Sequence, residues 1–98
     1  MAANPGQIYA SAVLRQFYSG ELRTVKTEAD RLNLEAIRRC LRDLSEAEQT
    51  ILKTVFTEGG DMPLRRAVAF AVCDGYESKE IWRLVRLVTR RFVAERVL

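Results

Sequence analysis

The chain has 98 residues and a hydrophobic content of 48%, which suits one domain with an ordinary apolar core and no structural disulfide or metal. It has no histidine and two distant cysteines, which excludes a zinc site, and it lacks the apolar run needed to span a membrane. The N-terminus also lacks the cationic and apolar blocks of a secretory signal, so we expect a cytoplasmic protein that does not bind membranes.

The net charge of +3 is unevenly distributed along the chain. Residues 1–58 hold eight Lys and Arg and eight Asp and Glu, whereas residues 59–98 hold eight and five. The whole cationic excess therefore lies in the C-terminal part. Thirteen of the 16 cations are Arg, whose guanidinium group suits bidentate contact with phosphate.

Apolar residues recur at intervals of three and four throughout, which predicts an all-α small helical bundle. The first helix is expected to start at Asn4, as the cap, and Pro5, and to run to about Tyr18. Gly20 should end it. Its inward side chains are expected to be Val13, Leu14, Phe17 and Tyr18.

Two apolar stripes follow in the sequence. They consist of Leu22, Val25, Ala29 and Leu32, and of Leu34, Ile37, Leu41 and Leu44. The phase of the pattern slips at Asn33, so we expect a short break there, with Asn33 capping the next helix. A single bent helix is the alternative.

Ser45 and Glu48 form a capping box, which predicts the start of a further helix that ends at Gly59-Gly60. Its apolar residues are Ile51, Leu52, Val55 and Phe56. Pro63 is expected to open another helix, which Gly75 closes. The apolar residues of this segment nearly encircle it, so it should be largely buried. Cys40 and Cys73 are also expected to be buried as small apolar residues.

The last helix begins near Ser78 and carries two interleaved stripes. Its apolar stripe is Ile81, Val85, Val88 and Phe92, and its cationic stripe is Lys79, Arg83, Arg86 and Arg90. On a helix each set falls within an arc of about 60°, and the two centres lie roughly 160° apart. We therefore expect one face in the core and the opposite face outward, with Glu80 to the side of the cations.

The cationic stripe raises the question of a partner. Like charges at this spacing repel within a helix, and solvated faces usually mix signs. An anionic partner would relieve that repulsion. A helix, a tight turn and a basic amphipathic helix are also the arrangement that places a second helix in the major groove of DNA.

Residues 44–59 resemble the opening of region four of bacterial sigma factors. The matching positions are Leu44, Glu48, Ile51, Leu52, Phe56, Glu58 and Gly59. The segment from Gly75 resembles the glycine turn and recognition helix of that family, with Ile81 at its first core position. The resemblance implies a C-terminal helix-turn-helix in which Lys79, Trp82 and Arg83 face DNA.

The sequence also departs from that family. The span from Gly59 to Gly75 is longer, Asp74 replaces an apolar residue, and Glu77 stands where a Ser or Thr cap is common, so Ser78 could cap instead. Nothing N-terminal resembles the promoter-melting region two. The chain therefore looks more like the small sigma-like regulators of bacterial mobile elements and phages.

These patterns predict a DNA-binding transcriptional regulator of duplex DNA. We expect Lys79 and Arg83 to enter the groove and Arg86 and Arg90 to bind phosphates. Further candidate contacts are Arg65 and Arg66, beside the N-terminal amides of their helix, and Trp82, for which partial burial is an equal alternative.

Residues 44–98 would form the sigma-like part of the single domain, and residues 1–43 would complete the core or dock RNA polymerase or a second copy. A helical protein-interaction module, acting as an adaptor or anti-activator, is the alternative function. We expect no enzyme and no cofactor, because the sequence offers no evident nucleophile with its base and no phosphate-binding glycine motif.

Overall fold

The computed structural model describes residues 5–58 and 64–97, and within these ranges it contains helices and no strand. The all-α prediction is confirmed. The elements are α1 Pro5–Ser19, the 3-10 helix η1 Glu21–Arg23, α2 Glu28–Leu41, α3 Glu46–Glu58, α4 Leu64–Cys73 and α5 Ser78–Arg96. None of the described helices is long and apolar enough to cross a membrane.

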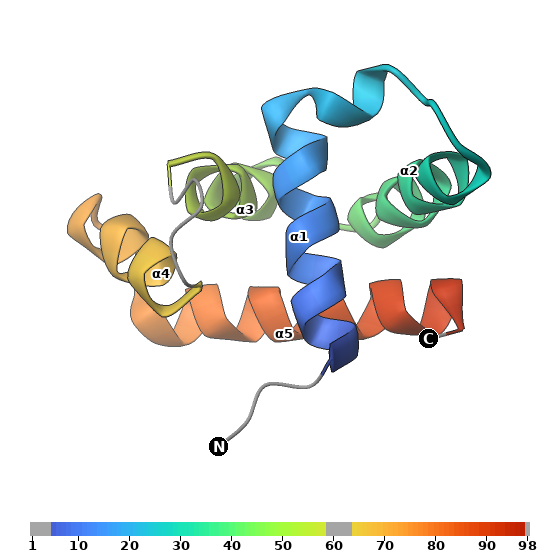
Figure 1. Ribbon diagram of the computed structural model, residues 1–98. Coiled ribbons are helices and arrows are strands. Elements are labelled where there is room, and N and C mark those ends of the chain that lie inside the picture. The colour runs from blue at the N-terminus through green and yellow to red at the C-terminus, as the bar shows by residue number, and fades with distance from the viewer. Residues whose placement is uncertain (1–4, 59–63, 98) are drawn as a thin grey trace.

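The longest helix, α5, forms the base on which the rest of the fold is assembled (Figure 1). It contacts all four other α-helices, and α1 crosses it. The predicted apolar stripe of α5 is confirmed: Ile81, Val85, Val88 and Phe92 are completely buried. Leu84 is buried with them. The other helices are thus held in place largely by one face of α5.

The first helix also follows the prediction. Val13 and Leu14 are buried, Phe17 and Tyr18 pack against the core, and Gly20, with φ of 91°, follows the end of α1. A positive φ costs glycine little, which explains the break at this position. The predicted Asn4 cap lies outside the described residues.

The break predicted at Asn33 is wrong, and so is the alternative of one bent helix. The chain breaks earlier, at residues 24–27, and the Thr27 hydroxyl accepts a hydrogen bond from the Asp30 amide to cap α2. Asn33 lies inside α2 and is buried. Val25 and Ala29 are exposed, so the first predicted stripe does not form.

The predicted capping box at the start of α3 is confirmed. The Ser45 hydroxyl accepts a hydrogen bond from the Glu48 amide, and the Glu48 carboxylate accepts one from the Ser45 amide. The predicted core residues Ile51, Leu52, Val55 and Phe56 are all buried. Gly59, Gly60 and Pro63, predicted to end α3 and begin α4, lie outside the described residues.

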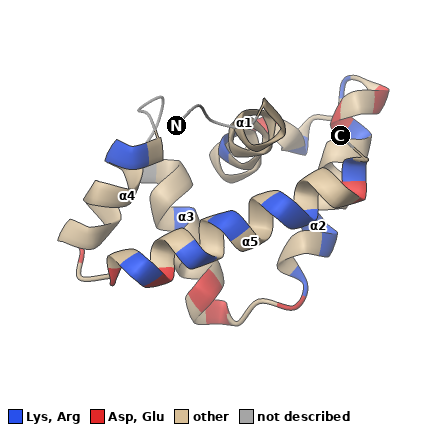
Figure 2. Ribbon diagram, turned by 90° about the horizontal axis from the view of Figure 1, so that it is seen from below, with Lys and Arg blue, Asp and Glu red and all other residues tan. Residues whose placement is uncertain are grey.

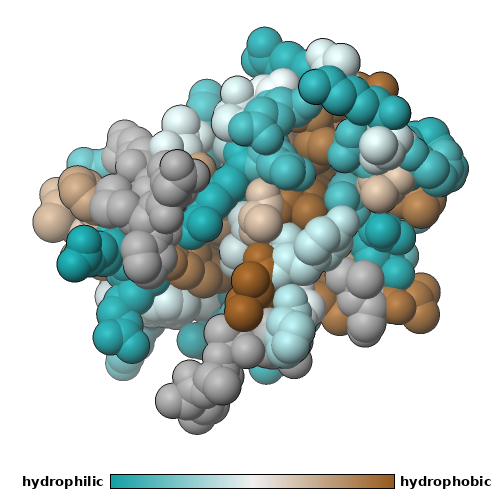
Figure 3. All heavy atoms as spheres, in the orientation of Figure 1, coloured by the Kyte–Doolittle hydropathy of each residue, from teal (hydrophilic) through white to brown (hydrophobic). Residues whose placement is uncertain are grey.

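The expectation that α4 is largely buried is wrong. Ala67, Val68 and Ala71 are buried, but Phe70 and Val72 are 50% and 39% exposed. Hydrophobic atoms lie at the outer end of α4 in Figure 3. The reason is position: α4 lies at the edge of the molecule and packs mainly against α3 and α5. Cys73, at its end, is exposed, contrary to prediction, whereas Cys40 in α2 is buried as predicted.

Residues 74–77 form a tight turn between α4 and α5. The amide of Tyr76 donates to the Ala71 carbonyl and that of Gly75 to the Val72 carbonyl, while Gly75 has φ of 101°. These paired bonds are a Schellman motif, which satisfies the last carbonyls of a helix. Glu77 occupies the cap position of α5 without a side-chain cap bond, so Ser78 begins the helix and does not cap it.

Candidate nucleic-acid interface

The four cations of the predicted stripe all lie on the exposed face of α5. Lys79, Arg83, Arg86 and Arg90 are exposed, and they project away from the side that carries the buried residues. Viewed from below, the basic positions follow one another along the helix (Figure 2). The separation of the two stripes, predicted from helix geometry, is therefore confirmed.

Arg83 differs from the other three because carboxylates of the same chain hold it. Its Nη2 atom donates to Glu80 Oε1 at 2.8 Å and to Glu48 Oε2 at 3.4 Å. The Glu80 hydrogen bond is the main cause that raises the pKa of Arg83. Glu80, expected to the side of the cations, thus pairs with one of them. Arg83 would have to exchange these carboxylates for a phosphate in order to bind DNA.

The remaining cations of the stripe are available to an external anion. Lys79, Arg86 and Arg90 form no ion pair with any other residue in the ranges 5–58 and 64–97. Thr89, on the same helix, bonds back to the carbonyls of Val85 and Arg86, so its hydroxyl is satisfied within the helix.

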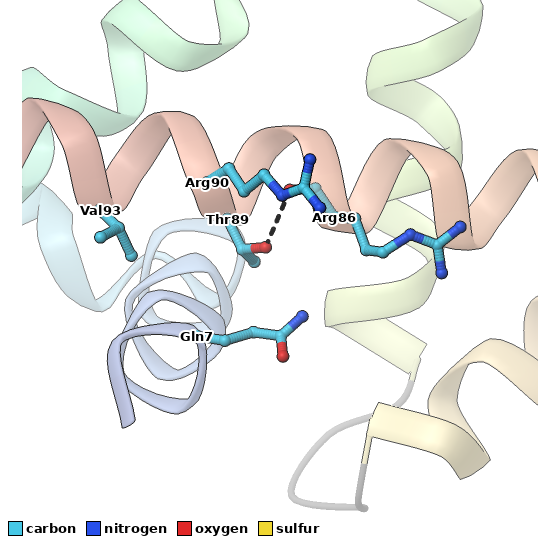
Figure 4. A pocket seen from close by; sticks show the side chains of 5 residues that line it. All are labelled: Gln7, Arg86, Thr89, Arg90 and Val93. Atoms are coloured by element: carbon cyan, nitrogen blue, oxygen red, sulfur yellow. Dashed lines mark hydrogen bonds between the residues drawn. The ribbon is translucent and has the colours of Figure 1, made fainter. Parts of the chain in front are cut away.

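An open pocket of about 300 Å³ lies where the start of α1 meets this basic face. It is lined by Gln7, Arg86, Thr89, Arg90 and Val93. Figure 4 shows the Gln7 amide pointing from α1 toward the space below Thr89 and Arg86. Two guanidinium groups and an amide supply several N–H donors, which is the chemistry that phosphate oxygens require.

Gln7 was missed by the sequence reasoning. It lies at the start of the chain, in a segment whose charge is balanced and whose residues show no binding pattern. Only the crossing of α1 over α5 brings it to Arg86 and Arg90. The sequence contains no local signal that would have found it.

The other predicted contact residues lie apart from this pocket. Trp82 is partly buried and packs against the core. Partial burial is the alternative to DNA contact that the sequence left open for this residue. Arg65 and Arg66 are exposed in the first turn of α4. Neither of these arginines lines the pocket formed by Arg86 and Arg90.

The described residues contain no group of three or more Cys, Asp or Glu side chains that could hold a metal ion. No protein-family model, curated protein or solved structure matches this chain. The resemblance to sigma region four therefore depends on the quoted sequence positions alone.

Proposed function

We propose that this protein is a DNA-binding transcriptional regulator in which α4, the turn at residues 74–77 and α5 act as a helix-turn-helix. The observation that carries the proposal is the outward row of Lys79, Arg86 and Arg90, which have no ion-pair partner in the described part of the chain. A polyanion would remove the repulsion between the guanidinium groups of Arg86 and Arg90, which are four residues apart.

The local geometry supports the same proposal. The Schellman turn at Gly75 is short and fixed by backbone hydrogen bonds, so α5 has a defined direction relative to α4. The buried side of α5 is held by the core, which keeps its cationic side outward. A helix presented in this way is suited to the major groove, where Arg side chains can pair with guanine or with the flanking phosphates.

The pocket at Gln7 supplies a specific phosphate contact in this proposal. A phosphate beside Arg86 and Arg90 would also receive the Gln7 amide, so α1 would help to set the position of the protein along the duplex. Arg83 would contribute after leaving Glu48 and Glu80, at some cost in free energy.

The test is duplex binding by fluorescence anisotropy at two or more salt concentrations, with a short duplex that holds one copy. With about four phosphates neutralised, log K should fall against log salt with a slope near −3.6. Arg86→Glu combined with Arg90→Glu should abolish binding.

The matched control compares single substitutions that change the net charge equally. Arg90→Glu should weaken binding strongly, whereas Lys26→Glu should leave it nearly unchanged. Lys26 is exposed in the segment before α2, away from α5 (Figure 1). A flat salt response, or equal effects of the two substitutions, would contradict the proposal.

A helical protein-interaction module is the second candidate, and the exposed Phe70 and Val72 favour it. Two large apolar side chains exposed in the last turn of a helix are a surface that a protein partner would cover. This function predicts no affinity for random duplex at low salt, together with co-purification of a protein partner. The anisotropy experiment therefore separates the two candidates.

A further inference from the structure

A second pocket, of about 530 Å³, lies away from α5, where the end of α1, η1, α2 and α3 meet. Its lining combines an apolar surface with cations from three different elements. The apolar residues are Phe17, Tyr18, Leu22 and Leu34, and the cations are Arg23, Arg38 and Lys53. We call it the α1–α3 pocket. Its volume falls in the range that accepts a small ligand or several side chains.

The cations of the α1–α3 pocket are not neutralised within the described ranges. Arg23, Arg38 and Lys53 are exposed, and none forms an ion pair with another described residue. Three uncompensated positive charges around apolar side chains favour an occupant that is itself apolar and acidic.

The outer end of α4 has the complementary composition. Phe70 and Val72 are half and more than one-third exposed, and Asp74 and Glu77 follow them in the exposed turn. Neither carboxylate pairs with a cation among the residues that the structure describes. We call these four residues the α4 tip. Phe70 and Val72 are two residues apart and point to different sides of the helix, so Phe70, the more exposed of the two, is the main apolar contact of the tip.

The α4 tip cannot reach the α1–α3 pocket of its own chain. In Figure 1, α4 ends at the left edge of the molecule, whereas η1 and α2 lie beyond α1 on the other side. The helix packs mainly against α3 and α5. A contact between the two surfaces must therefore join two copies.

We propose that the α4 tip of one copy docks in the α1–α3 pocket of a second copy. Phe70 would cover the apolar lining, and the two tip carboxylates would pair with the pocket cations. A single contact uses the tip of one copy and the pocket of the other, so the pair as a whole leaves one pocket and one tip free. The free tip and pocket of the pair either meet each other, which closes a two-fold dimer, or bind further copies in a ring or a chain.

This self-association uses residues of α4 and of the turn in the proposed helix-turn-helix, but none of the basic stripe. Neither surface includes Lys79, Arg86 or Arg90, so the basic stripe stays free in the assembly. The contact is also small, and interfaces well below about 1,000 Å² are weak. We expect association that rises gradually with concentration and weakens with salt, because it depends partly on exposed charges.

The test is sedimentation of the full chain without DNA at low salt, at concentrations up to about 1 mM because so small a contact is weak. Two charge-reversal variants are compared: a tip variant, Asp74→Lys with Glu77→Lys, and a pocket variant, Arg23→Glu with Lys53→Glu. The wild type should exceed the mass of a monomer as concentration rises. Each variant alone should remain monomeric, because its tip and pocket then carry the same sign.

An equimolar mixture of the two variants should associate again, because each tip then faces a pocket of opposite sign. This recovery also shows that the variants are folded. As a matched control, Asp74→Lys should weaken association, whereas Asp43→Lys should not, since Asp43 is an exposed acid in the turn between α2 and α3. A wild type that stays monomeric, or a mixture that stays monomeric, would overturn the proposal.

Discussion

Asn33 joins three helices through its side chain. It lies in the middle of α2 and is 3% exposed; its Nδ2 donates to the Tyr9 hydroxyl at 2.9 Å, and its Oδ1 accepts from Arg96 Nε at 2.8 Å. Asparagine is a poor residue for a helix interior. Its presence there is explained by these bonds to α1 and α5, which satisfy both ends of a buried amide.

We predict that Asn33→Ala lowers the free energy of unfolding by about 1–2 kcal/mol. Two side-chain hydrogen bonds are lost, at about 0.5–1.5 kcal/mol each, and the better helix propensity of alanine returns about 0.5 kcal/mol. Urea denaturation measures the change. Tyr9→Phe removes only one of the bonds and should cost less. Equal stability of Asn33→Ala and the wild type would show that the bonds contribute nothing.

Cys40 should make the stability of the fold depend on pH, and the sign of this dependence follows from the burial of its thiol. Burial raises the pKa of its thiol from 9.0 to about 11, because the interior does not solvate a thiolate. Between these values the unfolded chain has released this proton and the folded chain still holds it. The contribution of Cys40 to stability is therefore fully present below about pH 9 and decreases as the pH rises toward 11.

Accordingly, we predict that Cys40→Ala loses less of its stability than the wild type when the pH is raised from 8 to 10.5. The difference between the two losses should exceed about 1 kcal/mol, since one pKa unit corresponds to about 1.4 kcal/mol. Urea denaturation at both pH values gives the comparison. Cys73→Ala is the control, because this thiol is exposed, and it should behave like the wild type. A parallel response of all three proteins would contradict the assignment.

At the scale of the elements, helix caps could be predicted from a few neighbouring residues, whereas the exposure of a helix at the edge of the fold could not. The capping box of α3 depends on Ser45 and Glu48 alone, so four residues of sequence were enough to predict it. The cap of α2 has a similar local signal, because Thr27 is followed by Asp30 three residues later. The prediction missed it because the break was placed from the apolar stripes. The exposure of Phe70 had no such signal, because it depends on α4 lying at the edge of the fold.

Gly75 provides the prediction at this scale, because its φ of 101° sets the angle between α4 and α5. Nothing lies within 4 Å of a Cβ atom added there, so Gly75→Ala costs only the strain of the left-handed backbone, about 1–2 kcal/mol. Gly75→Asn should cost less, since asparagine tolerates this conformation better. Thermal unfolding measures both variants. An alanine variant as stable as the wild type would indicate that the turn has changed conformation.

For the whole molecule, the division of α5 into a buried and a cationic face was predictable because both depend on one helical period. The residues that other helices bring to the exposed side of α5 could not be predicted. Arg83 meets Glu48, which is 35 residues earlier in the chain, and Gln7 reaches the basic face only because α1 crosses α5. Contacts of this kind depend on how the helices pack, which the period of a single helix does not contain.

The last prediction concerns one substitution that should raise stability and weaken DNA binding. Arg86 lies four residues before Arg90 and repels it, whereas the charge of Arg83, three residues earlier, is offset by Glu80 and Glu48. Arg86→Glu replaces the repulsion from Arg90 by an attraction and should raise the free energy of unfolding by about 0.5 kcal/mol. The same change places a carboxylate in the pocket beside Gln7, where we propose that a phosphate binds, and should weaken duplex binding at least tenfold.

Arg86→Gln separates the two effects, because it removes the repulsion without adding a negative charge. It should stabilise the fold less and weaken binding less than Arg86→Glu. Urea denaturation and anisotropy on the same samples give both quantities. If Arg86→Glu lowered stability as well as binding, the loss of binding could follow from damage to the fold. A rise in stability accompanied by a fall in binding instead identifies a surface whose repulsion is retained for a polyanionic partner.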